Sequence, residues 1–177
     1  MMQPEIRLAA ARDAADLARL NDAFNGVVRS PEDVRAQLGR GRGEVVAVAV
    51  LDARVVGFAC AQVAESFCYP QPHGEITELY VEEESRRIGA ASALIGFLEQ
   101  VLEERGVSDV RVLTGSDNGP AIAAYMRAGY APDDELLLTK QIGQPRRIGY
   151  TIFEPIGEVG VNQEPGAAEQ DKERGDD

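Results

Sequence analysis

The chain has 177 residues, of which 44% are hydrophobic and 27% are charged, and its formal net charge at pH 7 is −12. This length predicts one domain with a hydrophobic core, and the composition is that of a soluble globular protein. No apolar run approaches the ~20 residues that a membrane span requires, so no membrane partner is expected. The acidic balance argues against nucleic acid as a partner, because its recognition generally needs a basic face.

The N-terminus and the cysteines bear on location and on metal binding. Residues 1–5 do not form a basic segment followed by an apolar one, so no secretory signal is predicted and a cytoplasmic location is expected. Cys60, Cys68 and the single histidine, His73, do not have the spacing of a zinc site. Neither a disulfide framework nor a bound metal is therefore expected.

The chain begins with a strand pattern followed by a helix pattern. Residues 6–9 are expected to form the first strand. Asp13 is expected to cap a helix that carries Leu17, Leu20 and Phe24 on one side. This spacing predicts that the helix packs on the sheet through that apolar side.

A second helix and a pair of strands come next. Ser30 and Pro31 suit the cap and the first position of a helix that is expected to end at Gly39. Residues 44–50 and 55–62 predict two strands joined by a short turn. The sequence therefore favours a sheet whose early strands are neighbours.

Another strand leads directly into a long amphipathic helix. Residues 75–81 are rich in β-branched and aromatic side chains, which is typical of a strand. The following helix is indicated by apolar residues at positions i, i+3, i+4, i+7 and i+8, namely Leu94, Phe97, Leu98, Val101 and Leu102.

The last predicted elements surround a short helix. Residues 110–114 are expected to form the fifth strand, and residues 136–139 a late one. Between them, Asn118 is a plausible N-cap, Pro120 suits the first helical turn, and Gly129 suits the position that ends a helix.

The segment from Arg86 to Ala91 lies where a strand ends and a helix begins. Gly89, Ala90 and Ala91 leave room for a ligand to approach the backbone, and the first N–H groups of the helix carry the positive end of its dipole. A phosphate group is expected to bind there. The spacing is neither that of a Walker loop nor that of a dinucleotide fingerprint, so a nucleotide hydrolase is disfavoured.

Two motifs in this order resemble the signatures of the GNAT N-acetyltransferase superfamily. The first is Arg-x-x-Gly-x-Ala after the strand that ends Leu79-Tyr80-Val81. The second is Asn118-x-x-Ala121-x-x-x-Tyr125, with Gly129-Tyr130 four residues on. The resemblance covers roughly residues 4–140, and the chain is distantly similar to aminoglycoside 3-N-acetyltransferases. It implies an α/β fold with a mixed central sheet, flanked by helices and splayed between its fourth and fifth strands, with acetyl-CoA in the gap.

The resemblance also implies which residues bind the cosubstrate. Ala90 and Ala91 stand where the family often has a β-branched residue and glycine, which implies weaker rather than lost affinity. Asn118 and the backbone of the preceding strand are expected beside the pantetheine arm. The expected cosubstrate-binding residues are Leu79, Tyr80, Val81, Arg86, Arg87, Ile88, Gly89, Ala90, Ala91, Asn118, Ala121 and Tyr125.

Amine acetylation requires a base that deprotonates the amine and an acid that protonates the departing sulfur. A lysine-like amine with a pKa near ~10 needs ~4 kcal/mol to deprotonate at pH 7, and a carboxylate can remove that proton. Glu75 and Glu78 are the candidates, with Glu78 preferred, and strand alternation puts them on opposite faces unless a bulge intervenes. By resemblance, Tyr125 is the general acid for the departing sulfur, and the backbone N–H at Val81 faces the carbonyl oxygen.

The sequence determines the acceptor amine less well than it determines the cosubstrate. Acidic residues near the expected cleft would attract a cationic amine, and they are Glu65, Glu75, Glu78, Asp133 and Asp134. An aminoglycoside, a polyamine or an amino-acid derivative is the favoured small-molecule acceptor. A protein or peptide amine is the alternative, and a non-catalytic domain that binds acetyl-CoA is an alternative of another class.

The chain divides into three parts by composition. Residues 1–142 are assigned to the acetyltransferase domain. Residues 143–163 form an extension that adds a strand or a strap, or packs loosely, and residues 164–177 form an acidic tail whose composition is typical of disorder. The sequence fixes no oligomeric state, and a homodimer is one arrangement that it allows.

Overall fold

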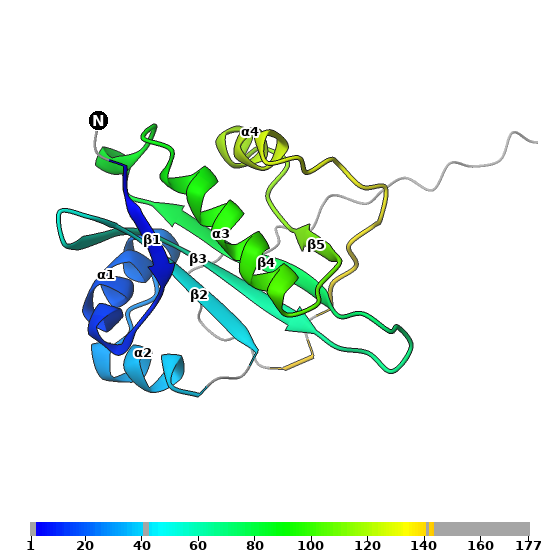
Figure 1. Cartoon of the computed structure of the whole chain (residues 1–177), viewed down its shortest axis with the longest axis horizontal. Coiled ribbons are helices and arrows are strands. Elements are labelled where there is room, and N and C mark those ends of the chain that lie inside the picture. The colour runs from blue at the N-terminus through cyan, green and yellow to red at the C-terminus, as the bar shows by residue number, and fades with distance from the viewer. Residues whose placement is uncertain (1–2, 41–42, 141, 144–177) are drawn as a thin grey trace, which may run out of the picture.

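The strands of the protein form one five-stranded sheet with helices on both faces (Figure 1), seen in a computed structural model that describes residues 3–40, 43–140 and 142–143. Two short 3-10 turns, Ala11–Asp13 and Glu83–Ser85, precede helices. The other elements in chain order are β1 (Glu5–Leu8), α1 (Ala14–Asn25), α2 (Pro31–Leu38), β2 (Glu44–Leu51), β3 (Arg54–Ala64), β4 (His73–Val81), α3 (Ala90–Glu104), β5 (Asp109–Val112) and α4 (Gly119–Arg127).

The strands lie in the order β1-β2-β3-β4-β5, and only the last pair is parallel. β5 pairs with β4 only from His73 to Ile76. Beyond Ile76, the stretch of β4 from Thr77 to Val81 has no partner on that side among the described residues. The sheet is therefore splayed between its fourth and fifth strands, as the resemblance implied.

Two apolar clusters hold the helices to the sheet. On one face α3 buries Leu94, Leu98 and Leu102 against residues of β2, β3 and β4, so the predicted helical stripe is confirmed. On the other face, Leu17 and Leu20 of α1 pack on β2 and β3. Figure 1 shows α3 crossing the sheet, with α1 and α2 near the β1 and β2 side.

The start of α2 follows the predicted chemistry. Ser30 is the N-cap, and its hydroxyl oxygen accepts a hydrogen bond from the backbone N–H of Asp33 at 3.1 Å. Pro31 is the first helical residue, where its missing N–H costs nothing. The helix ends at Leu38, next to the predicted Gly39.

Asp13 departs from its predicted role. It lies at the N-cap position of α1, but its carboxylate makes no capping hydrogen bond there. Instead it accepts two hydrogen bonds from the Arg7 guanidinium, at 2.7 and 2.8 Å, and one from the backbone N–H of Ala10. The bond with Arg7 lowers the pKa of Asp13, so this buried carboxylate joins β1 to α1 as an ion.

Two predictions for the C-terminal part of the chain need correction. Residues 136–139 form no strand, and Leu136 and Leu138 are exposed at 82% and 81%. A β-strand forms through hydrogen bonds to a neighbouring strand, and among the described residues this segment pairs with none. β5 also ends at Val112 rather than at residue 114. The predicted extension beyond residue 143 and the acidic tail lie outside the described residues.

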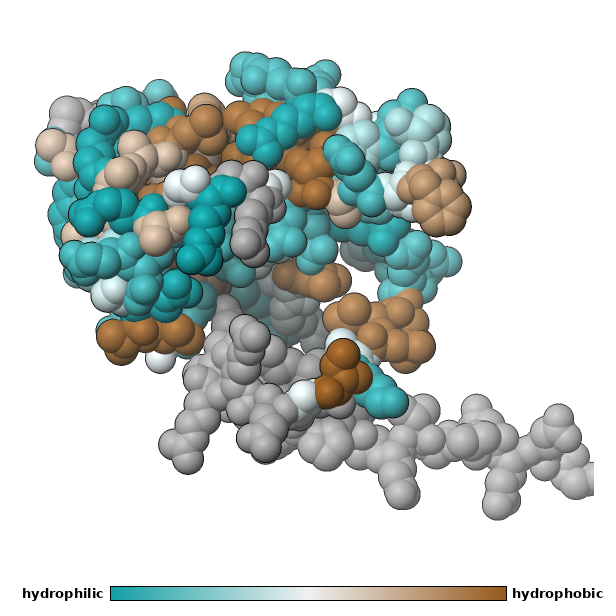
Figure 2. All heavy atoms as spheres, turned by 90° about the horizontal axis from the view of Figure 1, so that it is seen from below, coloured by the Kyte–Doolittle hydropathy of each residue, from teal (hydrophilic) through white to brown (hydrophobic). Residues whose placement is uncertain are grey.

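The helices that the structure describes are too short or too polar to span a membrane. Figure 2 shows the side seen from below in Figure 1 as largely hydrophilic, with apolar groups between the polar ones.

Candidate active site

A β-bulge in β4 decides where its two glutamates point. Ile76 pairs with Ala61 and Glu78 pairs with Cys60, so Thr77 is an extra residue in the ladder. Residues directly opposite each other on antiparallel strands share a face, and Glu75 pairs with Gln62. Because Cys60 and Gln62 share a face of β3, Glu75 and Glu78 both lie on the α1 and α2 side of the sheet. The sequence pattern did not decide whether this strand contains a bulge, and the structure shows that it does.

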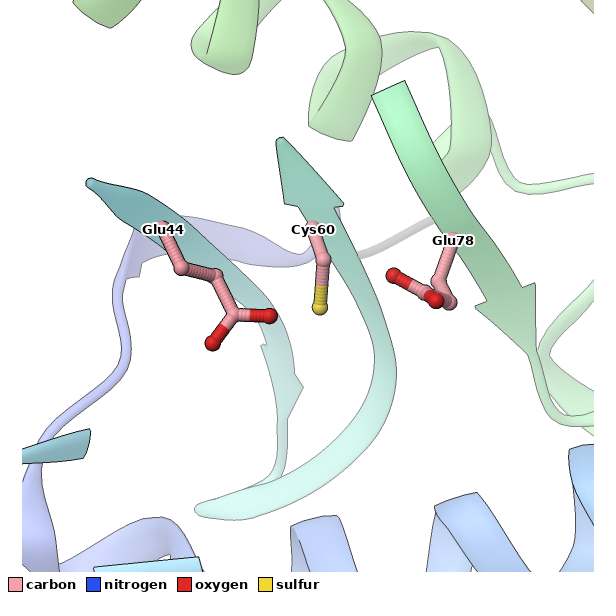
Figure 3. A group of neighbouring side chains, drawn as sticks. All are labelled: Glu44, Cys60 and Glu78. Carbon is pink, nitrogen blue, oxygen red and sulfur yellow. The ribbon is translucent and has the colours of Figure 1, made fainter. Parts of the chain in front are cut away.

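Glu78 meets two other polar side chains on this face. Glu44 of β2, Cys60 of β3 and Glu78 point into the same space, with the thiol between the two carboxylates (Figure 3). Their nearest carboxylate oxygens and the sulfur all lie within 4.8 Å of one another. The hydroxyl of Thr77 donates a hydrogen bond to the Glu78 carboxylate, which fixes that side chain beside the bulge.

A cavity of about 360 Å³ opens at these three residues, between the sheet and the helices α1 and α2. Its volume is within the range of small-molecule sites. Glu75 is exposed and does not line it. The lining residues are Leu17, Asn21, Asn25, Val27, Arg29, Val34, Gln37, Leu38, Glu44, Val46, Phe58, Cys60 and Glu78.

Burial and mutual repulsion set the charge states at the cavity floor. Burial, and then the negative charge of Glu78, raise the pKa of Glu44 above its usual value. Burial and the same carboxylates raise the pKa of the Cys60 thiol well above its ordinary value. The thiol is therefore neutral at pH 7, and the cavity floor favours a positively charged occupant.

The start of α3 has the geometry of an anion site. Gly89 is the N-cap with φ = 87°, and Arg87 before it has φ = 65°, so the chain turns sharply into the helix. No side chain caps this end of α3, so its first N–H groups are available to a ligand. A Cβ placed at Gly89 would meet no atom within 4 Å, which leaves open space beside the backbone.

Three arginine residues lie at this helix start. A second cavity, of about 120 Å³, is lined by Arg86, Arg87 and Arg127 together with the small residues of the turn. Arg86 also donates a hydrogen bond from Nε to the backbone oxygen of Val81 at 3.0 Å, which joins the loop to the end of β4. Three cationic residues and a free helix N-terminus favour the binding of an anion such as a phosphate group. Ile88 packs on the central core, Ala90 is buried, and Ala91 is partly buried.

The free stretch of β4 presents backbone to the gap in the sheet. Leu79 packs toward α3, and Val81 is buried on the same side. Tyr80 faces the other side, where its ring lies 5.2 Å from that of Phe24 and 6.3 Å from that of Phe58. The three residues are therefore held by their side chains, while their backbone faces the side without a strand partner.

The second motif lies on α4. Asn118 is the N-cap, and its side-chain oxygen accepts a hydrogen bond from the backbone N–H of Ala121 at 3.3 Å. Tyr125 is 7% exposed, and its ring meets that of Tyr130 edge-on at 5.6 Å. Burial, and then the charge of Glu78, raise the pKa of Tyr125 to about 12. Tyr125 belongs to the core on the α3 side, so it and Glu78 lie on opposite sides of β4.

Two groups at these cavities were not predicted from the sequence. Glu44 reaches Glu78 only because β3 places its own Cys60 between them. Arg127 reaches the start of α3 from the end of α4. Neither residue belongs to a motif, and only the strand order and the packing of the helices bring them to the site.

Solved structures of acetyltransferases resemble this fold. An aminoglycoside acetyltransferase from an uncultured soil metagenomic sample is 22% identical, with 78% of this chain and 95% of that chain covered and a TM-score of 0.68. A second such enzyme, also from soil, is 20% identical, with 80% and 100% covered and a TM-score of 0.69. The ribosomal-protein-alanine N-acetyltransferase of Brucella melitensis biovar Abortus 2308 is 22% identical, with 79% and 100% covered and a TM-score of 0.67. At these identities the likeness shows the fold.

The sequence itself shows the family. The model of the acetyltransferase (GNAT) family matches residues 14–130, which is more than half of the chain. This match spans the cavity at Glu78, the start of α3 and the motif on α4. The chain therefore belongs to the GNAT family of acetyltransferases, acyltransferase enzymes that use acetyl-CoA as cosubstrate.

Proposed function

We propose that the protein transfers an acetyl group from acetyl-CoA to the primary amine of a small cationic molecule, by direct attack in a ternary complex. The observation that carries this proposal is the cavity beside Glu78, which holds a carboxylate of β4 next to the splayed gap of the sheet. An aminoglycoside, a polyamine or an amino-acid derivative has the chemistry that this cavity favours.

The start of α3 would bind the cosubstrate. Arg86, Arg87 and Arg127 would neutralise the phosphates, and the N–H groups after Gly89 would donate to them. The free backbone of β4 beyond Ile76 would pair with the pantetheine arm. When bound, acetyl-CoA supplies a thioester whose C–S bond breaks as the C–N bond of the product forms.

In this proposal Glu78 accepts a proton and Tyr125 donates one. Glu78 takes a proton from the acceptor's ammonium group, which frees the lone pair that attacks. The backbone N–H of Val81 donates to the carbonyl oxygen as that oxygen gains negative charge. The ammonium loses two protons in all, of which one leaves through Glu78 to solvent and the other reaches the departing sulfur. The Tyr125 hydroxyl, which its raised pKa keeps protonated, donates toward that sulfur.

The size of the cavity favours a small acceptor over a protein. A cavity of about 360 Å³ that opens between two helices and a sheet suits a compact molecule. A protein amine would have to reach Glu78 through the opening of this cavity.

A turnover screen tests the function. Release of the CoA thiol should be measured with acetyl-CoA and four classes of amine: a polyamine, an aminoglycoside, an amino-acid ester and a peptide with a free N-terminus. We expect turnover above background hydrolysis with at least one of the first three. Turnover with the peptide alone would make the protein a peptide or protein acetyltransferase. Acetyl-CoA binding without turnover in any arm would make it a binding domain.

The two glutamates of β4 should behave differently. Glu78→Gln should lower kcat/KM about 10²-fold at neutral pH. The loss should shrink as pH approaches the amine's own pKa of ~10, because free amine then needs no base. Glu75→Gln should leave the pH profile of kcat/KM nearly unchanged, since Glu75 lies outside the cavity.

Other outcomes of the same measurement are informative. The reverse pattern would assign the base to Glu75. A loss in both variants without recovery at high pH would mean that the carboxylates attract a cation and transfer no proton.

A further inference from the structure

Glu44 is a charged group at the cavity floor to which no part of the proposed reaction has given a role. We propose that Glu44 is a specificity-determining residue, which together with Glu78 holds one ammonium group of the acceptor between two carboxylates. This inference rests on the proposed function and adds the form in which the acceptor binds, as a primary alkylammonium ion. Glu44 and Glu78 are called the carboxylate pair below.

The spacing of the carboxylate pair is short enough for one ammonium group to reach both carboxylates. An N⁺–H···O⁻ hydrogen bond measures about 2.8 Å, so two such bonds at the tetrahedral angle place their acceptor oxygens about 4.6 Å apart. The nearest oxygens of Glu44 and Glu78 lie within 4.8 Å of each other. One ammonium nitrogen can therefore donate to both carboxylates while its C–N bond points into the cavity.

The two carboxylates of the pair repel each other, and a bound cation would offset this repulsion. Burial and the charge of Glu78 raise the pKa of Glu44, which means that the second negative charge is costly there. The other titratable or charged groups that line the cavity are the neutral Cys60 thiol and Arg29. Arg29 forms no ion pair with either carboxylate. A cationic acceptor would remove the repulsion that the free protein carries.

The rest of the cavity suits a carbon chain behind the ammonium. Its walls are formed by apolar side chains from both helices and the sheet, while Asn21 and Gln37 supply polar groups. Apolar walls with a few polar groups are typical of sites that orient a small molecule by one charged end. The apolar lining residues are Leu17, Val27, Val34, Leu38, Val46 and Phe58.

The carboxylate pair also accounts for the release of product. Acetylation converts the bound ammonium into a neutral amide: the C–N bond forms to the acetyl carbon as the C–S bond of acetyl-CoA breaks, one proton passes to Glu78, and the other reaches the departing sulfur. The amide carries no charge for Glu44 to hold, so the electrostatic part of binding is lost when the reaction is complete. Glu44 thus favours substrate over product.

Glu44→Gln is the decisive variant, because it keeps the side chain's size and removes its charge. With butylamine and 1,4-diaminobutane as acceptors, we expect the amine KM to rise about 10- to 100-fold. The value of kcat should change less than about threefold, and the KM for acetyl-CoA should be unchanged. Glu32→Gln, which removes one charge from the exposed start of α2 outside the cavity, is the control and should leave all three constants unchanged.

Stability supplies a readout that a structural role for Glu44 would not give. A raised carboxyl pKa means that the folded state holds its proton more tightly, so stability falls as pH rises from the unfolded pKa of ~4.3 through the folded value. Glu44→Gln removes this loss, so at pH 8 the free variant should melt at the same or a higher temperature than the parent protein. A variant that melts lower and binds amine equally well overturns the proposal.

Three further results would also overturn it. An unchanged amine KM in a folded Glu44→Gln variant that still acetylates butylamine would reject the carboxylate pair and leave the proposed function standing. Zn²⁺ binding by calorimetry that needs Glu44, Cys60 and Glu78, together with turnover lost to EDTA and restored by Zn²⁺, would make the group a metal site. If no amine is acetylated by the parent protein in the turnover screen, the proposed function fails with it.

Discussion

Gly89→Val should weaken acetyl-CoA binding at least tenfold, which is about 1.4 kcal/mol. Gly89 has φ = 87° at the start of α3, a conformation that β-branched residues avoid, and its open side is the space that the phosphates would enter. Valine would both displace the backbone N–H groups and fill that space. Isothermal titration with acetyl-CoA measures the effect directly.

The opposite end of α3 offers a matched control. Gly106 follows that helix with φ = 82°, and a Cβ there would also meet nothing within 4 Å. Gly106→Val therefore carries a similar backbone strain of ~1–2 kcal/mol far from the arginine-lined cavity. Both variants should lose similar thermal stability, and only Gly89→Val should lose affinity. Equal affinities in the two variants would remove the start of α3 from the cosubstrate site.

Tyr125→Phe should lower kcat about 10²-fold while leaving the KM for acetyl-CoA within about twofold. The change removes the hydroxyl that donates toward the departing sulfur and keeps the ring that packs in the core. Since the pKa of Tyr125 is raised to about 12, the hydroxyl stays protonated, and kcat of the parent protein should show no decline caused by Tyr125 below about pH 11. Pre-steady-state and steady-state release of CoA measure these constants.

Tyr130→Phe is the control for Tyr125→Phe. Its ring meets Tyr125 edge-on at 5.6 Å, so the two variants make the same chemical change in one aromatic pair. We expect kcat of Tyr130→Phe to stay within about twofold of the parent value. If both variants lose turnover equally, the hydroxyls act on packing; if neither loses turnover, solvent protonates the sulfur.

Local sequence signals predicted the elements that depend on local chemistry. The stripe of Leu94, Leu98 and Leu102 predicted α3, and Ser30 with Asn118 marked the starts of α2 and α4. These signals are readable because a cap or an apolar stripe acts within one or two helical turns. The strand that leads into the start of α3 was predicted from another local signal, its content of β-branched and aromatic residues.

Features that depend on distant partners were not readable. Asp13 looked like a cap because of its neighbours in sequence, but Arg7 of β1 binds its carboxylate. Residues 136–139 have a strand composition without a described neighbour to pair with. Glu44 joins Glu78 through the register of three strands, which no single segment encodes. In each case the presence or absence of a tertiary partner decided the outcome, and local sequence does not encode that partner.

The bulge at Thr77 coincides with the point where β5 stops pairing with β4, since Ile76 is the last paired residue. A bulge bends its strand and increases its twist, which turns the rest of β4 away from β5. Deleting Thr77 would keep the pairing on β3 in register, with Ile76 and Glu78 then adjacent opposite Ala61 and Cys60. The same deletion would straighten β4 and let the parallel pair continue. We therefore expect the opening in the sheet to depend on this one inserted residue, so that deletion of a single codon would favour a continuous sheet.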